Sequence, residues 1–124
     1  MMNPVGWFEI PAKDFERACE FYKAVFGYEY QIMEVHNHKM AFLPHNEKAP
    51  GATGAIIYGG SGVPSKEGCV IYLFAGEHIE SAFEKIKNAG GEVILDIMDI
   101  PGGGVYSQFL DTEGNRLGLH AMGR

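Results

Sequence analysis

The sequence predicts an α+β protein built from two βαβββ units, and three observations support this fold class. Segments 15–28 and 79–92 carry apolar residues at the i, i+3, i+4 and i+7 spacing of a helix with one buried face. Each segment follows one strand-like run and precedes about three more. Residues 59–66, GGSGVPSK, are rich in Gly, Ser and Pro, as expected of a linker between the two halves.

The first unit is predicted over residues of about 4–58. Its first strand is VGWFEI (5–10), and Asp14 stands where the N-cap of the following helix belongs. Gly27 stands where a left-handed residue ends a helix. Three further strands are expected, namely EYQIMEV (29–35), KMAFL (39–43) and GAIIY (54–58).

The second unit is predicted over residues of about 67–122, and the two units are expected to form one domain, 1–124. Its first strand is CVIYLFA (69–75), and its helix ends at Gly90-Gly91. The strands that follow are EVILDI (92–97), VYSQFL (105–110) and RLGLHA (116–121). A shift of 64 residues superposes the helices and matches Glu16 with Glu80, Ala18 with Ala82, Glu20 with Glu84, Lys23 with Lys87, and Gly27 with Gly91. Because one helix cannot cover the apolar face of its sheet, we expect the units to pair.

The composition limits the possible partners. A formal charge of -6 disfavours nucleic acid or an anionic membrane and favours a neutral or cationic ligand. No apolar run approaches the roughly 20 residues of a membrane-spanning helix, and no secretory signal opens the chain. Cys19 and Cys69 fall in apolar segments without a CxxC pattern, so we expect buried, reduced thiols in a cytoplasmic protein.

Three stretches of the sequence are characteristic, namely IPAKDFERACEFYKAVFGYEY (10–30), AGGEVI (89–94) and DTEGNRLGL (111–119). With them the chain resembles the vicinal oxygen chelate superfamily, the group of glyoxalase I, bleomycin-resistance proteins and extradiol dioxygenases. The resemblance covers nearly the whole chain. It implies that the βαβββ units form a curled, cup-like mixed sheet, and that the protein is a homodimer. It does not fix the chemistry, because one fold supports many reactions.

The resemblance also implies where a metal would bind, since the first and last strands of each unit usually offer one His, Gln or Glu ligand. Counting seven residues back from Asp14 gives Trp7, and counting seven forward from Asp111 gives Gly118. The repeat shift adds Ile71 and Gly54. None of these four side chains coordinates a metal. A shift of one residue gives Phe8, Ala55, Tyr72 and Leu119, which is no better, so we expect no bound metal and no cofactor.

Glu9 and His120 are the candidate catalytic residues. If Trp7 and Gly118 face the cup, strand alternation places Glu9 and His120 there as well. Glu9 would then raise the pKa of His120, giving an acid or a base for proton transfer. The alternative is a structural histidine near the C-terminus and a solvated or surface-paired Glu9.

The candidate ligand-binding residues are Trp7, Tyr58, Tyr72, Tyr106 and Gln108. Trp7 would stack on a planar ligand or fill the space that a metal would otherwise take, and both readings stay open. The tyrosines would supply polar groups to an apolar pocket or simply pack in the core. His36 and His38 have metal-ligand spacing but fit a solvated turn better, and IPGGGVY (100–106) is expected to be a loop at the rim of the cup.

These features favour a protein that binds a small organic molecule in the cup without a metal, similar to the drug-sequestering bleomycin-resistance type. One alternative is a glyoxalase-like lyase or isomerase that uses Glu9 and His120 for proton transfer. Others are a metal-dependent enzyme with a non-standard site, and a degenerate domain whose role is association.

Overall fold

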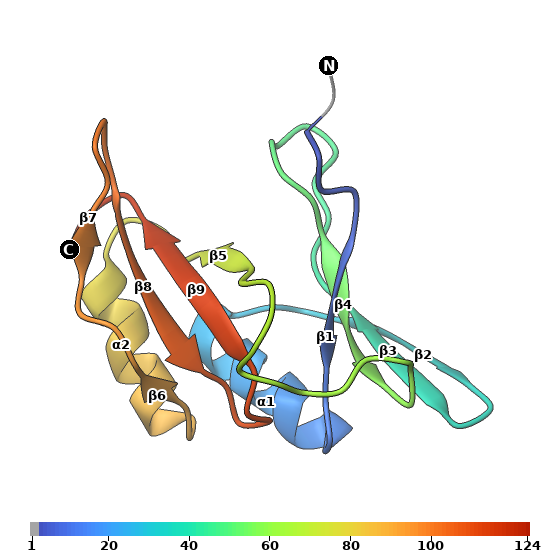
Figure 1. The fold of residues 1–124 in the computed structure, drawn as a ribbon. Helices are drawn as coiled ribbons and strands as arrows, with labels where there is room; N and C mark the ends of the chain where they lie inside the picture. The colour runs from blue at the N-terminus through green and yellow to red at the C-terminus, as the bar shows by residue number, and fades with distance from the viewer. Residues whose placement is uncertain (1–2) are drawn as a thin grey trace.

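The computed structural model describes residues 3–124, and within them it has two helices and two mixed sheets (Figure 1). The α+β class is therefore confirmed. In chain order the elements are β1 (Phe8–Pro11), α1 (Phe15–Phe26), β2 (Gln31–Val35), β3 (His38–Phe42), β4 (Gly54–Tyr58), β5 (Tyr72–Phe74), α2 (Ile79–Asn88), β6 (Glu92–Val93), β7 (Met98–Asp99), β8 (Val105–Leu110) and β9 (Arg116–Ala121).

The two sheets have the same basic topology. Sheet A has the strand order β1-β4-β3-β2, and sheet B has the order β5-β9-β8-β6 with β7 also paired to β8. In each sheet the first strand of the unit runs parallel to the last, β1 with β4 and β5 with β9. The paired residues also follow the shift of 64 residues, since Phe8 pairs with Gly54 and Tyr72 pairs with Gly118.

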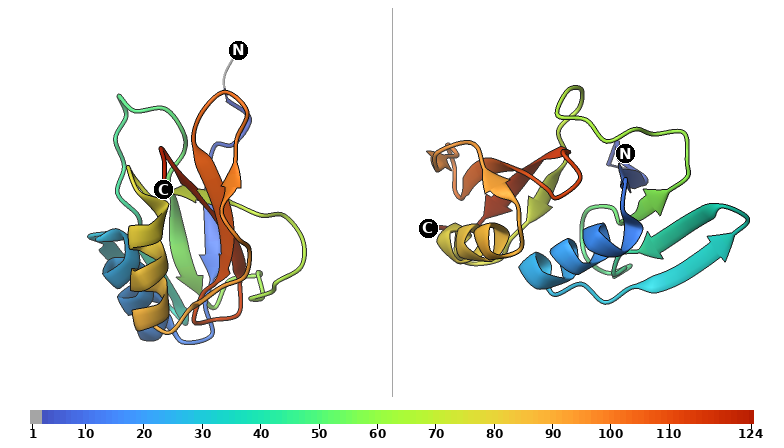
Figure 2. Two further views of the ribbon diagram at one scale, coloured as in Figure 1. Left: turned by 90° about the vertical axis from the view of Figure 1, so that its left-hand side faces the viewer. Right: turned by 90° about the horizontal axis from the view of Figure 1, so that it is seen from below.

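Both sheets pack one face against the helices and share one hydrophobic core. Figure 2 (right) shows the two helices on the same side of the sheets. Ile56 of β4, Leu119 of β9 and Phe21 of α1 belong to this core and are almost completely buried. The Phe21 ring also stacks on Phe109 of β8, with 6.0 Å between the ring centroids. Each sheet therefore keeps a second face that no helix covers, which we call its open face.

The helix ends follow the sequence pattern. The Asp14 side chain caps α1 by accepting a hydrogen bond from the backbone N–H of Arg17, at 3.1 Å. Gly27 ends α1 with φ 74°, the left-handed conformation that suits glycine. Helix α2 lacks a side-chain cap at His78 and ends two residues earlier in the repeat, at Asn88 with C-cap Ala89, and Gly90 follows with φ 96°. Neither helix of residues 3–124 is long and apolar enough to cross a membrane.

The turn between β8 and β9 ties the second unit to the first. Glu113 accepts hydrogen bonds from the backbone N–H groups of Lys13 and Asp14 and pairs with Arg17 at 2.7 Å. Burial alone would raise the pKa of the Glu113 carboxyl, but these hydrogen bonds outweigh burial and hold the pKa below its usual value. The Asn115 amide donates to the carbonyl of Pro11 at 2.7 Å. The predicted turn thus holds the second unit to the first through hydrogen bonds and one ion pair.

Two sequence predictions are wrong in detail. Residues 92–97 do not form one strand, because the chain leaves β8 after Ile94 and pairs with it again at Met98. Between these points the Ser107 hydroxyl donates to the carbonyl of Leu95, which replaces a backbone partner. Cys69 is exposed rather than buried, while Cys19 is half-buried. Burial raises the pKa of the Cys19 thiol to about 11.

Candidate functional site

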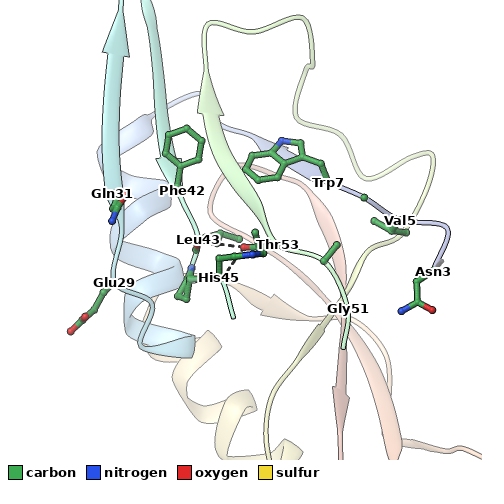
Figure 3. A pocket seen from close by; sticks show the side chains of 13 residues that line it. Asn3, Val5, Trp7, Glu29, Gln31, Phe42, Leu43, His45, Gly51 and Thr53 are labelled. Carbon is green, nitrogen blue, oxygen red and sulfur yellow. Dashed lines mark hydrogen bonds between the residues drawn. The ribbon is translucent and has the colours of Figure 1, made fainter. Parts of the chain in front are cut away.

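A cavity of about 910 Å³ lies at one end of the open face of sheet A (Figure 3). We call it the Trp7 cavity, because the Trp7 side chain forms part of its wall and is 44% exposed. The Phe42 ring stands beside the indole, with 6.0 Å between the ring centroids. The other lining residues are Asn3, Val5, Gly6, Glu29, Gln31, Leu43, Pro44, His45, Gly51, Ala52 and Thr53.

Strand alternation explains why these two rings meet. The Trp7 Nε1–H donates to the Glu9 carboxylate at 3.4 Å, so both side chains project from the open face of sheet A. Phe42 of β3 pairs with Ala55 of β4 and shares that face. Because Ala55 has only a methyl group, β4 places no large side chain between Trp7 and Phe42. Large aromatic surface is thereby left available to a ligand.

A second hollow of about 510 Å³ lies on the open face of sheet B and is lined by Tyr72, Phe74, Ile100, Tyr106 and His120. The rings of Tyr72 and Tyr106 meet edge to face with 6.0 Å between centroids, and those of Phe74 and His120 lie 5.6 Å apart. The Gln108 amide donates to the Tyr72 hydroxyl at 2.9 Å. Four predicted site residues, Tyr72, Tyr106, Gln108 and His120, therefore gather on this face.

The structure does not bring Glu9 and His120 into one cavity of residues 3–124. Glu9 lies on sheet A beside Trp7, whereas His120 lies on sheet B beside Phe74. Their role as an acid–base pair stays a prediction. Tyr58 stands apart from both groups, at the end of β4 near Lys39.

The turn at His36 joins β2 to β3, and His36 takes φ 58° there. In the described part of the chain, no three His, Cys, Asp or Glu side chains are close enough together to hold a metal ion. Three residues that the sequence reasoning missed are Phe42, His45 and Phe74. Phe74 had a usable signal, because it lies two residues after Tyr72 on the same strand.

The fold and these surfaces can be compared with known proteins. The model of the Glyoxalase/Bleomycin resistance protein/Dioxygenase superfamily matches residues 5–119. The chain belongs to this superfamily. A glyoxylase-like domain-containing protein from Didymella fabae is 30% identical over 118 residues, which cover 90% of this chain and 88% of the relative.

Solved structures of superfamily proteins have the same fold. Glyoxalase I from Zea mays gives a TM-score of 0.68 at 19% identity over 95% of this chain, which spans only 46% of the maize chain. A mutant of the fosfomycin resistance protein FosX from Listeria monocytogenes gives 0.70 at 19% identity, covering 98% of this chain and 93% of the other. That FosX structure is complexed with Mn(II) and 1S,2S-dihydroxypropylphosphonic acid.

The strand register corrects two of the four positions at which this superfamily would place metal ligands. Gly54 pairs with Phe8 on the helix-facing side of sheet A, and Ile71 packs against the core. The open-face positions are Trp7, Ala55, Tyr72 and Gly118. Both positions were wrong because the shift of 64 residues matches Phe8 and Gly54, which face the helices, with Tyr72 and Gly118, which lie on the open face.

The residues at these four open-face positions do not fit a divalent metal. An indole N–H only donates, and alanine and glycine have no side-chain donor atom for a metal. The remaining group is the Tyr72 hydroxyl, which already accepts a hydrogen bond from Gln108. One neutral phenol is far from the three or four ligands of a typical site. These four side chains therefore do not form a divalent-metal site.

Gly118 is not simply a ligand position without a ligand, because the Tyr72 ring needs the space beside it. A Cβ atom at position 118 would overlap the ring of Tyr72, at a distance shorter than real Cβ atoms show to their neighbours. The Tyr72 ring thus lies directly against the backbone of β9. A Cβ atom at Gly54 would instead meet the backbone carbonyl oxygen of Phe8 first. Glycine at 118 therefore allows an aromatic ring to cover the strand, whereas glycine at 54 allows the backbone of β1 to approach closely.

Proposed function

We propose that this superfamily member binds a small aromatic molecule, neutral or cationic, in the Trp7 cavity, without metal ligands from the four open-face strand positions. The observation that carries the proposal is the half-exposed Trp7 indole facing a cavity of about 910 Å³. Ligand sites are usually apolar hollows of this size with a few polar groups at the edge. Here the polar groups include Glu29, Gln31 and His45.

The charge of the site favours a cationic ligand over an anionic one. Glu29 is the one carboxylate among the residues of 3–124 that line the Trp7 cavity, and the whole chain carries -6. A quaternary ammonium over an indole face gains about 0.5–2 kcal/mol from the cation–π interaction. An organic anion would be repelled by the carboxylate of Glu29 and by the negative charge of the whole chain.

We also propose that the protein works as a homodimer in the cytoplasm. Apolar side chains on both open faces support this proposal, because a second copy of the chain could cover them. Met33 on sheet A and Tyr72 and Phe74 on sheet B are all exposed to water in the single chain. The free thiols of Cys19 and Cys69 agree with a reducing compartment. Sedimentation equilibrium tests the assembly: we expect the mass of two chains, and a single-chain mass at micromolar concentration would contradict it.

Trp7→Ala is expected to weaken ligand binding about tenfold, because loss of an aromatic anchor typically costs on the order of 1–2 kcal/mol or more. The probe is benzyltrimethylammonium, titrated by calorimetry. Since Trp7 is the only tryptophan in the chain, quenching of its fluorescence reports the same event in the unaltered protein. Benzoate serves as the anionic comparison and should bind more weakly.

Met122→Ala is the control, because Met122 is an exposed apolar side chain after β9 and lines neither the Trp7 cavity nor the hollow on sheet B. It should keep the affinity of the unaltered protein. Equal losses in the two variants, or equal binding of benzoate and benzyltrimethylammonium, would count against the assigned site.

A further inference from the structure

A small cavity of about 150 Å³ lies beside the start of β9, and it shares no lining residue with the Trp7 cavity. Arg116 of β9 and Glu9 of β1 line it, and Val63 and Glu67 from the segment between the two units contribute as well. Apolar surface comes from Ile71 and other neighbours. We call this space the Arg116 cavity.

Arg116 differs from the other arginines of residues 3–124 because it forms no ion pair. Its Nε atom is buried and makes no hydrogen bond, and within residues 3–124 its guanidinium forms no ion pair. By contrast, Arg17 pairs with Glu113 at 2.7 Å and Arg124 pairs with Asp99 at 3.5 Å. Buried polar groups without partners are rare in folded proteins, so this one points to a missing partner.

The backbone around Arg116 is held firmly. Its N–H donates to the carbonyl of Ser65 at 3.2 Å, and the Ser65 N–H donates to the Asn115 side chain at 3.0 Å. Arg116 also pairs with Leu110 in the β8–β9 ladder. The cationic side chain is therefore presented by a fixed strand end and not by a loose loop.

We propose that the Arg116 cavity binds a small amino acid in its zwitterionic form. The guanidinium presents a planar set of N–H donors that matches both oxygens of a carboxylate. Glu9 and Glu67 line the same cavity and would repel a simple anion, but they suit the ammonium group of a zwitterion. The cavity, at about 150 Å³, has about one sixth of the volume of the Trp7 cavity, which favours a small ligand such as glycine or alanine.

This binding can be measured by calorimetry with glycine as the probe. We expect glycine to bind, and acetate and methylamine to bind at least tenfold more weakly, because each carries only one of the two charges. Arg116→Gln should weaken glycine binding at least tenfold. Arg116→Lys keeps the charge but lacks the Nε–H, and should give an intermediate loss. Arg124→Gln is the matched control and should leave glycine binding unchanged.

Cys69 offers a second readout, because its exposed thiol lines the same cavity. Glycine should slow the alkylation of Cys69 by iodoacetamide, measured by mass spectrometry, and should leave Cys19 unaffected. The inference is overturned if glycine does not bind, if acetate binds equally well, or if both Arg116 variants bind glycine as the unaltered protein does. Calorimetric titration of benzyltrimethylammonium into Arg116→Gln keeps this outcome separate from the proposed function, because Arg116 does not line the Trp7 cavity.

Discussion

Asp111→Ala is expected to lower the free energy of unfolding by about 3–5 kcal/mol, because it leaves several buried donors without an acceptor. The Asp111 side chain is only 5% exposed. It accepts hydrogen bonds from the backbone N–H groups of Glu113 and Asn115 at 2.8 and 2.9 Å. It also accepts from the Tyr22 hydroxyl at 2.8 Å and the Asn115 amide at 3.0 Å.

The pKa of the Tyr22 hydroxyl is consistent with this arrangement. Burial raises it well above its usual value, and the neighbouring Asp111 raises it further. The hydroxyl therefore stays protonated and acts as a donor to the carboxylate. Without Asp111 it would have no partner in a fully buried position.

Chemical denaturation measures the loss, and two variants control for it. Tyr22→Phe removes only the hydroxyl and should cost about 1–2 kcal/mol. Asp96→Ala changes an exposed aspartate and should fall within about 0.5 kcal/mol of the unaltered protein. If Asp111→Ala lowered the free energy of unfolding no more than Asp96→Ala does, the turn would not stabilise the contact between the two units.

Much of this network was visible in the sequence as a motif, but its connections were not. The turn 111–115 and both helices follow from local patterns of turn residues, caps and apolar spacing. That Glu113 reaches the start of α1 depends on contacts across nearly the whole chain. No local pattern carries that information.

At the candidate site, too, the sequence pattern could not predict which side chains lie on the open face, because one residue in a connection decides it. The helices repeat at a fixed spacing, but the connection from β5 to α2 has four residues (75–78), one more than the connection from β1 to α1 (12–14). A single residue changes the face of the sheet to which a side chain points, so Tyr72 replaces Ile71 on the open face. The gathering of Tyr72, Tyr106, Gln108 and His120 was still predictable, since strand alternation places them on one face.

Gly118→Val is expected to destabilise the protein by about 2 kcal/mol, because overfilling a packed position typically costs about 1–3 kcal/mol. A side chain at 118 would occupy the place of the Tyr72 ring. The ring would have to swing away from β9 and lose its hydrogen bond to Gln108.

The double variant Tyr72→Ala with Gly118→Val separates this clash from other causes. With the ring gone, valine suits a central strand, and the second change should cost nothing or stabilise the protein. The coupling between the two positions, measured by denaturation of the four proteins, should therefore be large. Additive effects would show that Tyr72 does not depend on Gly118.

The most direct test of the central claim is the affinity for benzyltrimethylammonium measured with and without a metal chelator. We predict the same dissociation constant in EDTA, in metal-free buffer and with added Mn²⁺, because the open-face positions Trp7, Ala55, Tyr72 and Gly118 give no donor set for a metal. Binding that disappears in EDTA and returns with Mn²⁺ would contradict the account.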